Sequence, residues 1–520
     1  MRSVQSAFDI AVVGSGFAGS LIAMIARRLG RTVVLLEKAK HPRFAIGESS
    51  TPLANLLLEE LCERYDLPRI RPLAKWGTWQ DSHPEIAVGL KRGFTFLHHE
   101  SGRDYSDDAL HRHQLLVAAS PNNHVADTHW YRPDFDAFLV AEAKRLGANC
   151  LDEVDLWGVE IEQPRPVLQG RHHGQPLEIH ARFVIDASGP RGFLHRALEL
   201  PEVPFKNLPA IQALYSHFTG VKRWDELHHP AGSPPYPIDD AAVHHVFDGG
   251  WIWVLRFGNG ITSAGATATA RLANELRFAE REAAWPRLLE RFPGVGAQFA
   301  EAKATVPFIH TRQLSFLSGY VAGKNWVLLP SAAGFVDPLL STGFPLTLLG
   351  IERLARILES NWDRPDFAEE LFNYSMQTTI ELVTTERLIA ALYATMSDFE
   401  LFSALTLLYF AAASFTESAR RLGKPELTGD TFLLGEHPVF GSRFRYCVDV
   451  ALQKPDRARR DDLLQKIQQA IEPVNVAGLG RAERRNWYPA RAEDLLASTD
   501  KLESTPEEIK AMLTRCGFGS

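Results

Sequence analysis

A β-α-β pattern at residues 8–37 limits the possible fold more than any other part of this chain. Residues 8–13 have the apolar composition of a short buried strand, residues 17–29 that of a helix, and residues 32–37 predict a second strand. Gly30 stands where a glycine commonly ends a helix. The sequence therefore predicts an α/β fold that contains a strand, a helix and a second, parallel strand in succession.

Three glycines in the turn between this strand and this helix have the spacing of a phosphate-binding turn. In Gly14-Ser-Gly16-Phe-Ala-Gly19, Gly14 permits the tight turn, Gly16 allows close approach of a pyrophosphate, and Gly19 lets the helix pack near the strand. The helix N-terminus would then face the phosphates. Glu37, 18 residues after Gly19, can accept a hydrogen bond from a ribose hydroxyl. Because an acid here would repel a 2′-phosphate, we predict a bound dinucleotide other than NADP.

The composition is that of a large globular protein without a basic surface. The 520 residues are 45% apolar, which is enough for a large core and more than one domain. A net charge of −7 argues against a nucleic-acid partner. The cysteines are scattered and the paired histidines lack metal-ligand spacing, so we predict neither a disulfide frame nor a bound metal.

The longest apolar run covers residues 401–415. Its roughly 15 residues fall short of the ~20 that a membrane-spanning helix needs, so we interpret it as a buried helix. The chain reaches its first predicted strand too early to hold a secretory signal peptide. These features predict a cytoplasmic protein without a membrane partner.

The remaining chain divides by composition. Strand-like runs separated by Gly249-Gly250 and Gly258-Asn-Gly260 predict antiparallel hairpins, and the chain is mostly helical from Phe344 to about residue 423. Further helical segments are predicted near residues 457–472 and 492–514. The predicted boundaries are 1–204 for the first part of a nucleotide-binding domain with interspersed substrate-side segments, 205–304 for an inserted antiparallel sheet domain, 305–360 for the last part of the nucleotide-binding domain, and 361–520 for a helical C-terminal region.

Three later segments favour FAD over NAD. Residues 43–52 follow the second predicted strand, residues 186–190 offer another glycine turn, and residues 335–343 lead into a helix. In order and spacing these segments resemble the flavin-contacting segments of the flavoprotein monooxygenase superfamily. The resemblance covers about residues 8–358 and implies a Rossmann-like FAD-binding fold of the flavoprotein monooxygenase type.

Four short stretches sharpen the resemblance to the flavin-dependent halogenases, particularly to the monodechloroaminopyrrolnitrin and chlortetracycline-type branch. Residues 41–50 look like that branch's flavin loop, and residues 89–96 are similar to the segment with the family's catalytic lysine. The family's FxxPxxSxG pattern is matched by Phe335, Pro338, Ser341 and Gly343. The start of its WxWxIP motif is matched by Gly249-Gly-Trp251-Ile-Trp253.

This resemblance implies halogenation of an electron-rich aromatic, of phenol or pyrrole type, with reduced FAD, oxygen, and chloride or bromide. The reaction would run through a flavin C4a-hydroperoxide and hypohalous acid. Lys91 and Ser341 would be catalytic, and the backbone N–H groups of Thr342 and Gly343 would hold the halide at a helix N-terminus. The implied flavin-binding residues are Gly14, Gly16, Phe17, Ala18, Gly19, Glu37, Ser49, Arg132, Gly334 and Asp337. Because no second dinucleotide fingerprint is evident, a separate NAD(P)H-dependent reductase would supply the reduced flavin.

Three departures from the family pattern keep other functions open. Leu255-Arg256 stands where the family has Ile-Pro, Pro330-Ser331 replaces a common Gly-Asp, and Leu340 replaces the glutamate of tryptophan halogenases. The last change argues against tryptophan as the substrate. The altered tryptophan motif favours, as the alternative, a FAD-dependent monooxygenase or oxidoreductase without halide chemistry, and the Pro330-Ser331 change favours a flavin-binding protein without turnover.

Each motif also has a plain structural interpretation. Lys91 beside Arg92 could be a surface charge pair, and residues 341–343 could be a helix cap that holds no halide. Trp251 and Trp253 could be ordinary sheet core. If residues 251–257 form a strand, the two tryptophans share a face with Leu255 and Phe257, and Arg256 lies on the opposite face.

Overall fold

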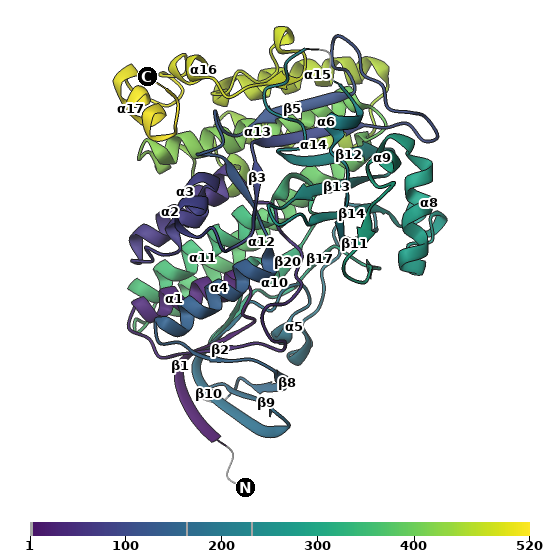
Figure 1. Cartoon of the computed structure of the whole chain (residues 1–520). Coiled ribbons are helices and arrows are strands. Elements are labelled where there is room, and N and C mark those ends of the chain that lie inside the picture. Colours follow the sequence, from purple (N-terminus) through teal and green to yellow (C-terminus); the bar gives the residue numbers. More distant parts are fainter. Residues whose placement is uncertain (1–3, 163–164, 230–231, 520) are drawn as a thin grey trace.

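The computed structural model describes residues 4–162, 165–229 and 232–519. Figure 1 shows a lower sheet around β1 and β10, an upper sheet around β12 and β13, and the last helices across the top of the molecule. The chain returns to both sheets from distant parts of the sequence. The region between the sheets is therefore assembled from separated segments.

The first sheet has eight strands and a parallel centre. Its order is β18-β19-β10-β1-β2-β7, and β9 and β8 follow β10 as antiparallel strands. Val13 at the end of β1 pairs with Asp186 at the end of β10, so the glycine turn lies beside the turn after β10. The strands are β1 (Val4–Val13), β2 (Val33–Leu36), β7 (Asn149–Leu151), β8 (Val154–Glu160), β9 (Val167–His172), β10 (Gln175–Asp186), β18 (Ala322–Gly323) and β19 (Trp326–Leu328).

Four helices pack together beside this sheet (Figure 1). They are α1 (Phe17–Arg28), α2 (Pro52–Arg64), α4 (Arg132–Arg145) and α11 (Gly343–Ser360). Helix α1 is buried from Phe17 to Ala26, as expected for a helix that is apolar on nearly all sides. Gly30 follows it with a φ of +78°, a conformation that favours glycine. The predicted β-α-β unit is confirmed.

The second sheet has nine strands and is mostly antiparallel. Its order is β15-β11-β14-β13-β12-β4-β5-β21, and β16 also pairs with β11. The strands are β4 (Gly93–His98), β5 (Gln114–Ala118), β11 (Ile211–Thr219), β12 (Ala242–Phe247), β13 (Gly250–Arg256), β14 (Thr262–Thr269), β15 (Lys303–Ala304), β16 (Ile309–Thr311) and β21 (Trp487–Tyr488).

The antiparallel hairpins predicted within residues 205–304 are present as β11 to β14, but the sheet extends beyond those limits. Strand β4 joins β12 in parallel, β5 joins β4, and β21 near the C-terminal end joins β5. Such pairing between distant segments leaves no local pattern in the sequence. The predicted boundaries 205–304 therefore do not enclose the whole sheet.

Two short sheets join segments that matter for the site. Strand β3 (Val88–Lys91) pairs with β6 (Asp127–Trp130), and Lys91 lies opposite Asp127. Strand β17 (Phe316–Leu317) pairs with β20 (Gly334–Phe335) shortly before α11. Shorter helices complete the middle of the chain: α3 (Trp76–Ser82), α5 (Phe193–Ala197), α6 (Trp224–Leu227), α7 (Ala270–Glu275), α8 (Ala284–Arg291), α9 (Pro293–Gln298) and α10 (Pro330–Ala333).

The C-terminal region is mainly helical, as predicted. Its helices are α12 (Phe367–Thr395), α13 (Phe399–Arg421), α14 (Phe440–Leu452), α15 (Arg457–Ile471), α16 (Ala492–Leu496) and α17 (Pro506–Arg515), of which α14 was not predicted. Among the described residues, α13 is the one helix long and apolar enough to cross a membrane, and most of its apolar stretch is buried in the protein. The interpretation of residues 401–415 as a buried helix is confirmed.

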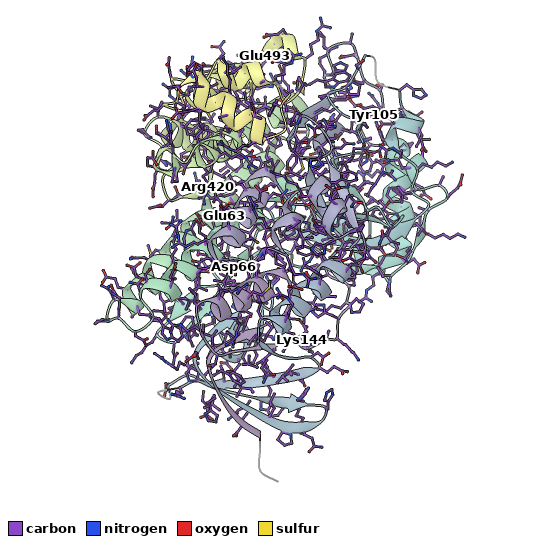
Figure 2. All side chains as sticks on the ribbon, turned by 60° about the vertical axis from the view of Figure 1, so that its left-hand side comes forward. Glu63, Asp66, Tyr105, Lys144, Arg420 and Glu493 are labelled. Atoms are coloured by element: carbon purple, nitrogen blue, oxygen red, sulfur yellow. The ribbon has the colours of Figure 1, made fainter. Side chains whose placement is uncertain are left out.

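Ion pairs fasten α13 to the nucleotide-binding part of the chain. Arg420 contacts Glu60 on α2 and lies 3.0 Å from Glu352 on α11. Figure 2 labels Arg420 and, on the facing end of α2, Glu63. Because these side chains are largely shielded from solvent, the contacts fix where the C-terminal helices sit over α2.

Candidate active site

The glycine turn after β1 is too crowded for a side chain at two of its glycines. Gly14 has a φ of +96°, and a Cβ there would lie 2.6 Å from the carbonyl oxygen of Ala187. A Cβ at Gly19 would lie 1.8 Å from the carbonyl oxygen of Gly14. At Gly16 the nearest atom would be the guanidinium Nη2 of Arg132, at 3.3 Å. The backbone at Gly16 thus faces a cation, which suits a diphosphate.

Arg132 fixes that positive charge. Its Nε and Nη2 donate to the carboxylate of Asp136, both at 2.8 Å, and its Nη1 donates to the carbonyl oxygens of Ile46 and Gly47. The guanidinium also lies 5.3 Å from the centre of the Phe17 ring. Arg132 therefore holds residues 41–50, the flavin loop, beside the glycine turn, where its predicted role toward the cofactor requires it.

Glu37 lies at the end of β2 next to the same turn. Its Oε2 accepts from the Ser15 backbone N–H at 3.0 Å, from the Ser15 hydroxyl at 2.9 Å and from Arg43 Nη2 at 3.1 Å. Burial raises the pKa of this carboxyl, but hydrogen bonds from Ala39 and Ser15 and the charge of Arg43 outweigh burial and hold it below its usual value. Glu37 is therefore ionised and fixed in place, and the predicted ribose contact remains a prediction.

The flavin loop is also anchored to the second sheet. Glu48 Oε1 and His217 Nε2 of β11 form a buried pair at 2.7 Å. The ring of Phe44 packs edge-on against His217, with ring centres 4.7 Å apart. Glu48 Oε2 is buried without a hydrogen-bond partner. Sequence reasoning missed this pair, which connects a loop of the nucleotide-binding part to the second sheet.

Lys91 is completely buried at the end of β3. Its Nζ donates to the hydroxyl of Ser49, at 2.9 Å, and to the backbone oxygen of Ser50. On its other side the ammonium lies 3.7 Å from the centre of the Phe94 ring. The interpretation of Lys91 and Arg92 as a surface charge pair is therefore wrong. Ser49, predicted to bind flavin, contacts the lysine.

Asp127 supplies the charge that faces Lys91 across the β3–β6 pair. Burial lowers the pKa of Lys91, and the Asp127 carboxylate partly offsets that effect. Burial raises the pKa of Asp127, and Lys91 partly offsets it. The two groups share an environment in which either proton can be lost near neutral pH. A lysine with a lowered pKa can exchange protons at the pH where the enzyme works.

A mainly apolar cavity of about 150 Å³ adjoins this pair. Phe94 and Asp127 form part of its wall, and Tyr409 and Phe410 of α13 form another part. Residues from the C-terminal end, among them Leu513 and Phe518, complete the lining. Sequence composition gave no sign that these last residues belong to the site. Residues 401–415 are therefore both core and cavity wall.

The N-terminus of α11 has the features of an anion site. Thr342 stands at the N-cap, as the helix-cap interpretation of residues 341–343 expects, but its side chain makes no capping hydrogen bond. The N–H groups of the first turn have no acceptor within the helix. A Cβ built on Gly343 would meet nothing within 4 Å. Open space therefore adjoins Thr342 and Gly343, where the halide is predicted to bind.

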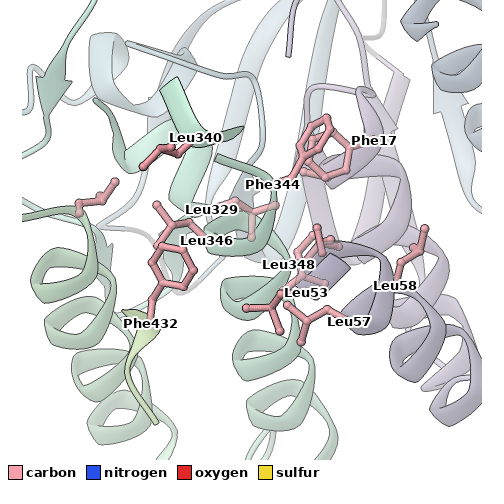
Figure 3. Packing of buried hydrophobic residues seen from close by; sticks show 14 of the residues in the cluster. Phe17, Leu53, Leu57, Leu58, Leu329, Leu340, Phe344, Leu346, Leu348 and Phe432 are labelled. Atoms are coloured by element: carbon pink, nitrogen blue, oxygen red, sulfur yellow. The ribbon is translucent and has the colours of Figure 1, made fainter. Parts of the chain in front are cut away.

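An aromatic cluster brings this helix start to the glycine turn. The rings of Phe344 and Phe17 lie side by side with their centres 5.0 Å apart (Figure 3). The rings of Phe344 and Trp130 of β6 have their centres 4.4 Å apart. Leu340 and Ser341, just before the helix, both have left-handed φ values, of 65° and 54°. The chain thus turns sharply into α11 beside the start of α1. The catalytic role predicted for Ser341 stays a prediction.

Protein donors hold the Asp337 side chain in place. Its Oδ1 accepts from Trp251 Nε1 at 3.2 Å and from the Leu339 backbone N–H at 2.8 Å, and its Oδ2 accepts from the Tyr393 hydroxyl at 2.9 Å. The residue is almost fully buried, and burial raises its pKa to about 6. The Asp337 side chain therefore anchors the turn before α11 to β13 and α12, and the cofactor contact predicted for this residue stays a prediction.

The other predicted flavin contacts are constrained by packing. Phe17 and Ala18 have buried side chains, so only their backbone can face a cofactor. A Cβ on Gly334 would lie 2.7 Å from the end of the Leu382 side chain, so a larger residue there would have to displace Leu382. These three contacts remain predictions.

The departure in the tryptophan motif does not disturb the tryptophans. Trp251, Trp253 and Leu255 belong to one hydrophobic core cluster, on the face of β13 predicted for them. Arg256 Nε donates to Asp239 at 3.0 Å, and its other nitrogens donate to the backbone oxygens of residues 221 and 222. The Arg256 guanidinium therefore has hydrogen-bond partners on the opposite face of β13.

The residues that surround the glycine turn fit FAD. A crowded turn, a buried arginine beside Gly16, an ionised glutamate at the end of β2 and an uncapped helix start converge on one region. When bound there, the flavin would supply the oxygen and redox chemistry. Lys91 would stand next to it, because the lysine bonds to the flavin loop.

Known proteins are similar to this chain over most of its length. Residues 123–399 match the family described as tryptophan halogenase. The chain is 28% identical to monodechloroaminopyrrolnitrin halogenase PrnC of Pseudomonas fluorescens over 76% of this chain and 70% of that one. It is 29% identical to tetracycline 7-halogenase of Kitasatospora aureofaciens over 82% of this chain and 76% of that one.

A solved structure shows the same fold. Halogenase PltM in complex with phloroglucinol and FAD superposes with a TM-score of 0.81 at 24% identity, over 92% of this chain and 99% of that one. The family match covers more than half of the 520 residues. This chain belongs to the tryptophan halogenase family and is a flavin-dependent enzyme of the oxidoreductase type.

Proposed function

We propose that this enzyme uses reduced FAD, oxygen and chloride or bromide to halogenate a small electron-rich aromatic of phenol or pyrrole type. One observation carries the proposal: the buried Lys91 contacts the flavin loop through Ser49 and the cavity wall through Phe94. Hypohalous acid released at the flavin would reach the aromatic ring past this ammonium. Lys91 would hydrogen-bond the acid or form a haloamine with it.

The size and chemistry of the cavity support a small free substrate. A protein cavity of roughly 150 Å³ can hold benzene, and the cavity beside Lys91 has about this volume. Leu340 is apolar and fully buried, which disfavours tryptophan as the substrate. The relative crystallised with phloroglucinol binds a phenol, and PrnC by its name acts on an aminopyrrolnitrin.

Halide would bind at the uncapped N-terminus of α11. A crystal soaked in bromide should show anomalous density within hydrogen-bonding reach of the N–H groups of Thr342 and Gly343. An empty site at saturating bromide would favour the monooxygenase alternative. Reduced flavin would come from a separate cytoplasmic NAD(P)H-dependent reductase.

The test is mass spectrometry of a phenol and pyrrole panel incubated with the enzyme, a flavin reductase, NADPH, FAD and bromide. We expect brominated products that require every component. If the products are only hydroxylated while bromide is present, the enzyme is a monooxygenase. NADPH oxidation by the enzyme alone, gated by substrate, would point to the same alternative.

A further inference from the structure

Two buried acceptor atoms at the edge of the cavity lack hydrogen-bond partners. Asn55 Nδ2 on α2 donates to Asp127 Oδ1 at 2.9 Å, which orders both side chains. Asp127 Oδ2 and Asn55 Oδ1 remain buried without a partner. Both residues line the cavity and both are more than nine-tenths buried. Unpaired buried acceptors are costly, so they predict a donor that arrives with the ligand.

Asp127 is also the acidic neighbour of Lys91. The β3–β6 register places the two residues directly opposite each other, and side chains at such positions share one face of the sheet. Lys91 Nζ donates to Ser49 and Ser50, and Asp127 Oδ2 has no hydrogen-bond partner among the described residues. The carboxylate therefore lies near the ammonium, and one of its oxygens is unpaired in a residue that lines the cavity.

Other charged or titratable groups around the pair do not compete for that role. Burial lowers the pKa of His129 and of His244 to about 3, so both imidazoles are neutral. Glu417 of α13 lies 2.8 Å from Arg421 and is paired with it. Arg421 also lies 3.5 Å from Glu59 of α2. Among these acids, Asp127 is the one with a buried oxygen that has no hydrogen-bond partner.

We propose that Asp127 is a catalytic residue that binds the ring O–H or N–H of the substrate and takes its proton. This inference rests on the proposed function and names the substrate class more narrowly, as aromatics with a hydrogen-bond donor directly on the ring. Asn55 is the positioning residue, because it holds Asp127 Oδ1 and leaves Oδ2 for the donor. Halogenation would occur on ring carbon activated by that same hydroxyl or N–H.

The proton transfers balance within the Lys91–Asp127 pair. A ring carbon forms a bond to the halogen of hypohalous acid, the O–halogen bond breaks, and its oxygen takes a proton from the Lys91 ammonium and leaves as water. The ring O–H bond gives its electron pair to the ring and its proton to Asp127. The resulting halodienone regains aromaticity when its C–H proton moves to oxygen. Proton transfer from Asp127 to Lys91 then restores the pair.

The binding test uses the wild-type enzyme loaded with FAD, so it does not depend on turnover. Calorimetry would compare phenol with toluene, which has the same size and no donor. We expect phenol to bind roughly 10- to 100-fold more tightly, the scale of a hydrogen bond to a charged group. Toluene binding as tightly as phenol would overturn the proposal, because an apolar cavity alone favours toluene.

The kinetic test uses Asp127→Asn, which keeps the shape and removes the base. With phenols that carry increasingly electron-withdrawing substituents, kcat/KM should fall roughly 100-fold for the least acidic phenol, and the loss should shrink as the phenol ionises by itself. The control is Asp239→Asn, which removes the buried carboxylate that pairs with Arg256 on the other face of the sheet. This change should affect all phenols equally. An equal loss across the panel with Asp127→Asn would make Asp127 structural and overturn the proposal. A wild type that halogenates nothing while phenol outbinds toluene would instead contradict the proposed function.

Discussion

The dinucleotide site and the lysine site of this enzyme are built in opposite ways. The glycine turn, α1 and Glu37 come from one stretch of chain, residues 8–37. Lys91 instead meets Ser49 from a loop, Asp127 from β6 and a cavity wall that includes Tyr409 of α13. The first site depends mainly on local backbone geometry, to which Arg132 adds a long-range contact, whereas the second depends on long-range packing throughout. Changes in the first site should therefore act on cofactor binding, and changes in the second on halogen transfer.

The largest expected effect is at Lys91. Lys91→Ala should lower halogenated product by about 100-fold or more, the scale for loss of a positioned proton donor or carrier. Reduced flavin should still be consumed with oxygen, because the flavin-side residues are intact. Product and oxygen consumption would be measured together. Lys91→Arg should not restore activity, because the pKa of a guanidinium is too high for proton exchange near neutral pH.

Lys303→Ala is the matched control for Lys91→Ala. Lys303 is exposed on β15, so its loss should change neither product nor oxygen consumption. Wild-type halogenation by Lys91→Ala would return Lys91 to a structural role. If flavin oxidation and halogenated product fell equally, Lys91 would instead be needed for the reaction of reduced flavin with oxygen.

The second effect is at Gly16. A Cβ there would lie 3.3 Å from Arg132 Nη2, which must shift slightly, so Gly16→Val should cost some stability but still fold. Its methyl groups should displace a diphosphate and weaken FAD binding by roughly tenfold or more, as expected when one charged hydrogen bond of ~1.5–3 kcal/mol is lost. FAD titration and thermal melting would separate binding from folding. Unchanged FAD affinity would mean that the diphosphate lies elsewhere.

The third effect is on halide. A Cβ on Gly343 meets no protein atom within 4 Å, so Gly343→Val should be tolerated by the fold. The added side chain should fill the predicted anion site and raise the KM for bromide roughly tenfold, the scale of ~1–2 kcal/mol at a helix N-terminus. Steady-state kinetics at varied bromide would measure it. An unchanged KM for bromide would mean that the halide does not bind at this helix N-terminus.

The smallest effect is on pH dependence. Halogenation should fall at high pH as Lys91 loses its proton and at low pH as Asp127 gains one, because burial lowers the first pKa and raises the second. In Asp127→Asn, the fall in residual activity at high pH should begin roughly one pH unit lower than in the wild type. The reason is that no carboxylate then stabilises the Lys91 ammonium. Rate profiles of halogenation and of flavin oxidation would test this. If the activity of Asp127→Asn instead fell at a higher pH than that of the wild type, the assignment would be contradicted.

The same contrast explains what the sequence could predict. The β-α-β unit and the crowded glycines follow from local patterns, and α1 and β2 were predicted to within a few residues. Lys91 could be found by resemblance, but its partner Asp127 could not, because no local signal pairs residues 88–91 with residues 127–130. Leu513 and Phe518 are separated from Lys91 by more than 400 residues and join its cavity only through folding.

The surroundings of Asp337 could not be predicted for a related reason. An acid in a flavin-like segment is visible in the sequence, but the donors that reach it are not. Trp251 of β13 and Tyr393 of α12 occupy its oxygens, and both come from distant parts of the chain. Glu37 differs because two of its partners, Ala39 and Arg43, are close in sequence.

A crystal structure with FAD and phenol would test the central claim most directly, namely that Lys91 separates the flavin from the aromatic substrate. We predict the phenol ring in the cavity bounded by Phe94 and Tyr409, with its hydroxyl at Asp127 Oδ2 and the flavin on the Ser49 side of the lysine. A phenol ring bound on the same side of Lys91 as the flavin loop, with the cavity empty at saturating phenol, would contradict the account.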